Sequence, residues 1–168
     1  MTITTDDIRR LREQTGAGVM ECKRALTQAE GDFEHAQKIL RSQGAVIAEK
    51  KAGREASQGV IEAYVHTQRE RPVGVLVEVN CETDFVARSD DFKQLARDLA
   101  LQIAAMNPKQ ISVDDGPAGE ELDSQEVLLT QPFIRDPDQS VQDRINETVS
   151  RVRERIVVRR FSRFELGA

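Results

Sequence analysis

Near the N-terminus, apolar residues recur at helical spacing in three short runs. Thr4 and Thr5 offer a cap for the first helix, and the second helix is expected to begin near Val19. Asp32 is a cap for the third helix, which is expected to end at Gly44, where a left-handed residue is favoured. Three helices this short make a bundle with a thin core, which is more typical of a binding adaptor than of a catalyst.

From Gly59 onward the pattern becomes that of strands. Val60–His66 is predicted as a strand, Gln68–Pro72 as a turn and Val73–Val79 as a second strand, so the segment is expected to form a hairpin. The second strand is apolar on both faces, and we therefore predict a central position for it in the sheet.

One long helix is predicted after this hairpin, because seven apolar residues form a continuous stripe at helical spacing. Ser89, followed by two aspartates, offers its start, and Asn107–Pro108 ends it. The stripe consists of Phe92, Leu95, Ala96, Leu99, Ala100, Ile103 and Met106.

The C-terminal third contains weaker signals. Residues 109–126 are acidic, include Gly116, Pro117 and Gly119, and are interpreted as an exposed connection, and Val127–Ile134 as a short edge segment. Asp136–Pro137 is expected to open a helix that buries Val141, Ile145, Val149 and Val152. Ile156–Leu166 is predicted as a strand whose alternation slips near Arg159–Arg160, as at a β-bulge. These elements predict an α+β fold with helices on one face of an antiparallel sheet.

The organisation that follows is a three-helix domain at 1–46, a basic linker at 47–58 and an α+β core at 59–168. The basic run Lys50–Arg54 lies in the linker. We interpret it as a solvated face. A contact with an acidic or phosphate-bearing partner is the alternative.

Composition narrows the class of protein. Hydrophobic residues make up 39% and charged residues 32%, and the net charge of −5 argues against broad nucleic-acid binding. Arginines cluster near the C-terminus, but the glutamates among them indicate a mixed solvated face. Cys22 and Cys81 are too few and too far apart for a disulfide framework. Without an apolar membrane span or an export signal, we expect a cytoplasmic protein.

The sequence gives no sign of catalytic chemistry. His35 and His66 lie in different units, so we expect no Ser–His or Cys–His nucleophile pair. Cys81, Glu82 and Asp84 mix soft and hard donors without tetrahedral spacing, so we expect no metal site. We therefore expect neither an enzyme nor a bound cofactor.

The segment from Asn80 to Phe92 joins the central strand to the long helix and carries an unusual pair, Asp84 and Phe85. In one interpretation Thr83 or Asp84 caps the helix and Phe85 lies in the core. In the other, Phe85 projects into a partner as a wedge, with Asp84 beside it as a polar anchor. Residue types alone leave both open.

Four motifs in order carry a resemblance. They are LREQTGAGVMECKRAL from Leu11, KKAGREASQGVI from Lys50, VEVNCETDFVARSDDF from Val77 and VRRFSRFELG from Val158. Together they strongly resemble bacterial translation elongation factor Ts, over residues 2–108 and 127–168.

The resemblance implies nucleotide exchange on elongation factor Tu, a GTPase that carries aminoacyl-tRNA. It also implies a ubiquitin-associated-like N-terminal domain that docks on the GTPase domain, while the rest of the core grips another domain of the partner. Asp84 and Phe85 match the signature pair of the family, and the resemblance implies that this pair intrudes beside the magnesium and phosphates of the partner. The expected partner-binding residues are Arg12, Val19, Met20, Lys23, Lys51, Thr83, Asp84, Phe85 and Val86, of which Val19 departs from the Met of many relatives.

Long family members carry two copies of the core, whereas this chain has room for one. The resemblance therefore implies the short type, which pairs as a homodimer and would give a 2:2 complex. The connection between residues 107 and 126 also lacks the helical insertion of some short relatives. A non-catalytic adaptor or scaffold, with a ubiquitin-associated-like domain and a dimerisation core, is the alternative.

Overall fold

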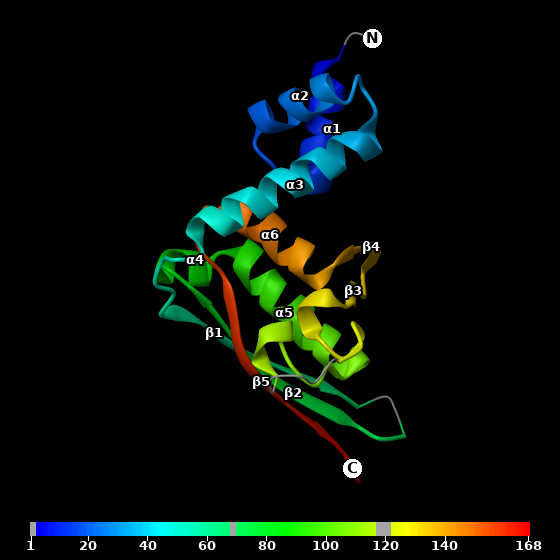
Figure 1. Cartoon of the computed structure of the whole chain (residues 1–168), viewed down its shortest axis with the longest axis vertical. Helices are drawn as coiled ribbons and strands as arrows, with labels where there is room; N and C mark the ends of the chain where they lie inside the picture. Colours follow the sequence, from blue (N-terminus) through cyan, green and yellow to red (C-terminus); the bar gives the residue numbers. More distant parts are fainter. Residues whose placement is uncertain (1–2, 68–69, 117–121) are drawn as a thin grey trace.

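Helices α1–α3 form one end of the molecule and a three-stranded sheet forms the other, with α5 and α6 between them (Figure 1). The computed structural model describes residues 3–67, 70–116 and 122–168. The mixture of helices and antiparallel sheet confirms the predicted α+β class. Across the described segments, no helix is both long and apolar enough to span a bilayer.

The N-terminal helices are α1 (Thr5–Thr15), α2 (Val19–Gln28) and α3 (Phe33–Lys51). The hydroxyl of Thr4 caps α1 by accepting from the amide of Asp7 at 3.2 Å, and Asp32 caps α3 as predicted. A small core of their own holds these helices together, composed of Leu11, Ala17, Cys22, Ala25, Leu26, Ala29, Ala36 and Leu40.

The prediction that the third helix ends at Gly44 is wrong, because α3 continues to Lys51. Gly44 is buried against α6 (Val141–Val152), where an added Cβ would lie 3.1 Å from the carbonyl oxygen of Asn146. The glycine therefore serves a close helix crossing and not a helix end. The first five residues of the predicted linker are helical, and the division into domains stays a prediction.

The sheet has the order β1–β2–β5 and is antiparallel throughout, which confirms the hairpin and the central second strand. Its strands are β1 (Gln58–His66), β2 (Val73–Cys81) and β5 (Val157–Glu165). Glu78 pairs with Arg160 and Val79 with Val158, so one extra residue bulges out of β5 at the predicted place. In the predicted turn at 68–72, residues 68 and 69 lie outside the described part.

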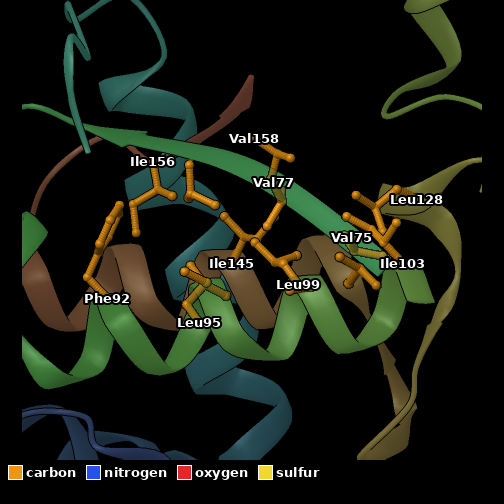
Figure 2. Close-up of a cluster of buried hydrophobic side chains, with 14 of the residues drawn as sticks. Val75, Val77, Phe92, Leu95, Leu99, Ile103, Leu128, Ile145, Ile156 and Val158 are labelled. Carbon is orange, nitrogen blue, oxygen red and sulfur yellow. The ribbon is translucent and has the colours of Figure 1, made fainter. Parts of the chain in front are cut away.

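One face of the sheet is covered by α5 (Asp90–Met106) and α6, and the main core lies between these layers. Figure 2 shows Phe92, Leu95, Leu99 and Ile103 of α5 pointing toward the buried valines of β2. The predicted stripe is buried except for Met106, which is 37% exposed because it lies at the helix end.

The segment between these helices differs from the prediction. Within Val127–Ile134, Leu128–Thr130 forms a 3₁₀ turn (η2) and only Pro132–Phe133 (β3) is a strand. Asp136–Ser140 is strand β4, paired with β3, so the helix predicted from Asp136 begins later, at Val141. Ser140 and Asp143 form a reciprocal capping box there, which is a stronger start signal than Asp136–Pro137.

In the acidic connection, Val113–Asp115 forms a 3₁₀ turn (η1) with exposed side chains. The predicted loop residues Pro117 and Gly119 lie outside the described residues.

Candidate partner-binding site

The corner between β2 and α5 is a short capped helix, α4 (Asp84–Arg88). The hydroxyl of Thr83 accepts from the amide of Val86 at 3.3 Å, so Thr83 and not Asp84 is the cap. Ala87 is buried against the core and Val86 packs against it. Ser89 then caps α5 directly, which leaves no loop between the two helices.

Phe85 is 83% exposed to solvent, and the interpretation that places it in the core is therefore wrong. In a helix of five residues, Val86 and Ala87 occupy the inward face, and Phe85 precedes them on the outward side. Asp84 beside it forms an ion pair with Arg88 at 3.2 Å. A large ring in water forgoes roughly 2 kcal/mol of burial free energy, which marks this position as a contact for another molecule.

Two carboxylates, those of Glu154 and Glu82, link the corner to the segment that follows α6. Glu154, just after α6, accepts from the amides of Glu82 and Thr83 at 3.1 and 3.0 Å and from the Thr83 hydroxyl at 2.6 Å. In return, Glu82 accepts from the amide of Arg155 at 2.7 Å and from Arg54 at 3.4 Å. The corner is therefore fixed to a segment more than 70 residues later in the chain.

These contacts set the electrostatics of the corner. The hydrogen bond from the Arg155 amide lowers the pKa of Glu82, and the charges of Arg54 and Lys51 act in the same direction. Lys51 therefore lies within electrostatic range of the corner. Burial and the nearby charge of Glu154 raise the pKa of Cys81 to about 11.

The thiol of Cys81 consequently stays protonated at neutral pH and donates to the carbonyl of Thr83 at 3.2 Å. Among the described residues there is no group of three His, Cys, Asp or Glu side chains able to hold a metal.

A second exposed apolar surface lies at the start of α2. Met20 is 63% and Val19 50% exposed, and the nearby Arg12 and Lys23 are also exposed. A shallow hollow of about 540 Å³ adjoins them, lined in part by Arg12, Val19, Met20, Arg151 and Arg153. Methionine beside cationic side chains suits an adaptable protein contact.

Arginines after α6 connect this surface to the core. Arg151 donates to the carbonyl of Thr15 at 2.9 Å and pairs with Asp91 at 3.3 Å, and Arg153 pairs with Glu21. The interpretation of the C-terminal arginines as only a mixed solvated face is therefore incomplete. Their partners lie up to 136 residues away, and no local signal in the sequence identifies such pairs.

The geometry brings the predicted residues together at two places. Thr83, Asp84, Phe85 and Val86 form the corner, with Lys51 near it, and Arg12, Val19, Met20 and Lys23 surround the start of α2. Their roles in binding stay predictions. Glu154 was missed because a single glutamate in an arginine-rich run has no distinguishing pattern.

Comparison with known proteins gives the family. The sequence model of the family described as Elongation factor TS matches residues 19–125. A protein named Elongation factor Ts from Herpetosiphon aurantiacus is 44% identical over 199 aligned positions that cover 100% of both chains. This chain belongs to the elongation factor Ts family.

Other elongation factor Ts relatives show the same full-length match. The Thermoanaerobacter sp. protein is 43% identical and covers 98% of this chain and 95% of its own length. The Coprothermobacter proteolyticus protein is 44% identical, over 99% of this chain and 100% of its own. The chain is therefore a translation elongation factor, with a role in protein biosynthesis.

This elongation factor Ts chain is shorter than some relatives. At least 31 of the 199 positions aligned with the Herpetosiphon aurantiacus protein are absent from its 168 residues. The expectation that the shortening lies between residues 107 and 126 stays a prediction.

Proposed function

We propose that this chain is a guanine-nucleotide exchange factor for elongation factor Tu, which promotes GDP release and so regenerates the GTP form during elongation. The observation that carries the proposal is the exposed Phe85 on a short, capped and braced helix. The ring can enter a partner without unfolding the corner, because its neighbours Val86 and Ala87 already hold α4 to the core.

Exchange by this route needs no covalent chemistry, so the factor is not an enzyme in the usual sense. A factor that weakens GDP binding must itself bind the GDP form more weakly than the nucleotide-free form, by the same ratio. Insertion of Phe85 beside the magnesium and phosphate region of elongation factor Tu would supply this difference. Loss of the magnesium charge would leave the diphosphate less neutralised, and GDP would dissociate faster.

Asp84 and Lys51 accompany the wedge in this proposal. The carboxylate of Asp84 is half exposed and pairs with Arg88 at the surface, so it can exchange that partner for a polar group of the GTPase at small cost. Lys51 adds a positive charge near the corner, close enough to lower the pKa of Glu82.

The surface at the start of α2 supplies affinity. Met20 and Val19 form a small apolar patch flanked by Arg12 and Lys23, on helices with their own core. This ubiquitin-associated-like domain would dock on the GTPase domain and place the corner at the nucleotide site. Two linked contacts bind more tightly than either one alone.

We further propose that the chain acts as a homodimer, paired through the outer face of its sheet. No described helix covers this face, and large apolar side chains emerge from all three strands and from the residue after β5. These side chains are Ile61, Val65, Leu76, Phe164 and Leu166, each at least half exposed. Two copies facing each other would bury them, and a 2:2 complex with elongation factor Tu would result.

The test is the release of fluorescent GDP from elongation factor Tu, measured by stopped flow with increasing amounts of this chain. We expect the release rate to rise to a plateau. Binding to elongation factor Tu without any acceleration would favour the alternative of an adaptor or scaffold. No binding at all would contradict the choice of partner.

A further inference from the structure

We propose that Glu154 is a positioning residue for exchange, which holds the Phe85 corner in the orientation that enters the partner. The inference rests on the exchange function proposed above and adds a residue that lies outside the signature motif. The hydrogen bonds of Glu154 go to the backbone and hydroxyl that begin α4, so it acts on Phe85 through the start of this helix.

The geometry is that of one carboxylate shared by three donors. Its Oε2 accepts from the consecutive amides of Glu82 and Thr83, at 3.1 and 3.0 Å, and its Oε1 accepts from the Thr83 hydroxyl at 2.6 Å. Hydrogen bonds to a charged acceptor are about twice as strong as neutral ones. Three of them fix both the path and the rotation of the chain at the entry to α4.

The Thr83 hydroxyl transmits this constraint to the helix. The hydroxyl donates its hydrogen to Glu154. Its oxygen lone pairs therefore stay free to accept from the amide of Val86. Because Phe85 lies between the cap and Val86, its backbone direction depends on this chain of two hydrogen bonds. A helix of one turn has little stability of its own and depends on such contacts.

The position of Glu154 is itself well determined. Arg153, the residue that follows α6, has a left-handed φ of +60° and turns the chain toward the corner. Ile156, two residues after Glu154, is buried in the main core. The amide of Arg155 binds Glu82 in the reverse direction, so residues 82–83 and 154–155 form a reciprocal pair of bridges.

The consequence concerns the maximum rate of exchange more than affinity. If the corner loosens, Phe85 still reaches the partner but delivers less of its interaction energy as distortion of the nucleotide site. Misplacement of a reacting or intruding group by about 1 Å can cost up to roughly a hundredfold in rate. The docking surface at Met20 lies on another element and does not contact Glu154.

The experiment compares E154A and E154Q with wild type in the GDP-release titration, using full-length protein. We expect E154A to lower the plateau rate roughly tenfold, with a half-saturating concentration within about twofold of wild type. E154Q should retain most of the plateau, because its amide oxygen still accepts from both backbone amides. The matched control is Glu70→Gln, which removes an exposed carboxylate at the opposite end of β2.

A second measurement uses the free protein, so that it does not depend on the partner. Amide hydrogen exchange at Glu82 and Thr83 should be faster in E154A and close to wild type in E154Q and Glu70→Gln. A wild-type plateau rate for folded E154A, or a change only in the half-saturating concentration, would overturn the assignment. If wild type itself released no GDP, the exchange function would fail, and unchanged amide exchange in E154A would separately refute the bracing.

Discussion

The orientation of Phe85 depends on its immediate neighbours. Val86 and Ala87 pack against the core, and the Thr83 hydroxyl caps the start of α4. The inward face of this short helix is therefore occupied, and the Phe85 ring points outward. A residue type that is normally buried is thereby displayed on a rigid support. Display of this kind is the residue-scale basis of the proposed wedge.

Phe85→Ala separates a structural from a functional role. If the ring makes no core contacts, its truncation should change the free energy of unfolding by less than about 0.5 kcal/mol. Truncation of a phenylalanine in the core would lower that free energy by roughly 3–5 kcal/mol. We expect an unchanged melting temperature, continued binding to elongation factor Tu and a much lower plateau rate of GDP release. A melting curve and a stopped-flow trace on the same preparation check this. A large drop in melting temperature together with full exchange activity would argue against the wedge.

The sequence predicts part of this site. A cap at Thr83 or Asp84 follows from residue type and position, and the resemblance favours the interpretation in which Phe85 projects outward. The exposure of Phe85 could not be decided locally, because it depends on which neighbours the core accepts. Glu154 could not be found at all, since its partners lie 71 and 72 residues away and only the fold brings them together.

At the scale of elements, long periodic segments were predicted well and short ones were not. The stripe of α5 and the slip in β5 are strong local patterns, and both are confirmed. Strands β3 and β4 have only two and five residues, too few for a period to show. Gly44 was misassigned because a glycine at a close helix crossing and a glycine at a helix end look the same in sequence.

In the contact between α3 and α6, burial disfavours the charged form of the Glu147 carboxyl group. Burial raises the pKa of Glu147 more than the adjacent Arg144, Arg151 and Arg41 lower it. The folded state therefore holds the proton of Glu147 more tightly than the unfolded state does. Stability from this residue is present below its ordinary pKa and is lost as pH rises through the raised value.

Glu147→Gln should remove this loss, because the amide stays neutral at every pH, while it gives up the ion pair with Arg41, whose Nε lies 3.6 Å from the carboxylate. We expect the variant to melt higher than wild type at neutral pH, with the difference shrinking toward about pH 4, where a glutamate in the unfolded chain also takes up its proton. Melting curves across this range test it. A variant that melts lower than wild type at neutral pH would show that the ion pair with Arg41 outweighs desolvation.

Helix α2 gives a prediction about affinity. Met20→Glu places a charge in the exposed apolar patch, where it should leave stability unchanged. We expect the half-saturating concentration in the GDP-release titration to rise roughly tenfold, with an unchanged plateau. Gln28→Glu, exposed at the other end of α2, is the control. A lower plateau at saturating Met20→Glu would mean that the N-terminal helices take part in exchange itself.

At the scale of the whole molecule, the two proposed contact surfaces are held in one arrangement. Arg151 and Arg153 fasten the N-terminal helices to the end of α6, and the next two residues fasten the corner. A segment of five residues therefore fixes both surfaces relative to the core. Such preorganisation reduces the entropy lost when both surfaces bind one partner.

At the same scale, the outer face of the sheet presents large apolar side chains to solvent. Exposed apolar side chains grouped on one sheet face are a liability for aggregation in a monomer, and a second copy would cover them. Leu76 lies at its centre, between Ala63 on β1 and Ser162 on β5, and is 51% exposed. Lysine at this position would place two charges at the centre of a symmetric interface without disturbing the inner face of the sheet.

Leu76→Lys should therefore convert a dimer into a folded monomer. We expect light scattering at micromolar concentration to give twice the 18.9 kDa chain mass for wild type and a single chain mass for the variant. The melting temperature of wild type should rise with protein concentration, and that of Leu76→Lys should not, because only a dimer gains stability by mass action. Val46→Lys, a similarly exposed aliphatic position on α3, is the matched control and should stay dimeric. A monomeric wild type, or a Leu76→Lys variant of unchanged mass, would mean that the outer face of the sheet is not where two copies meet.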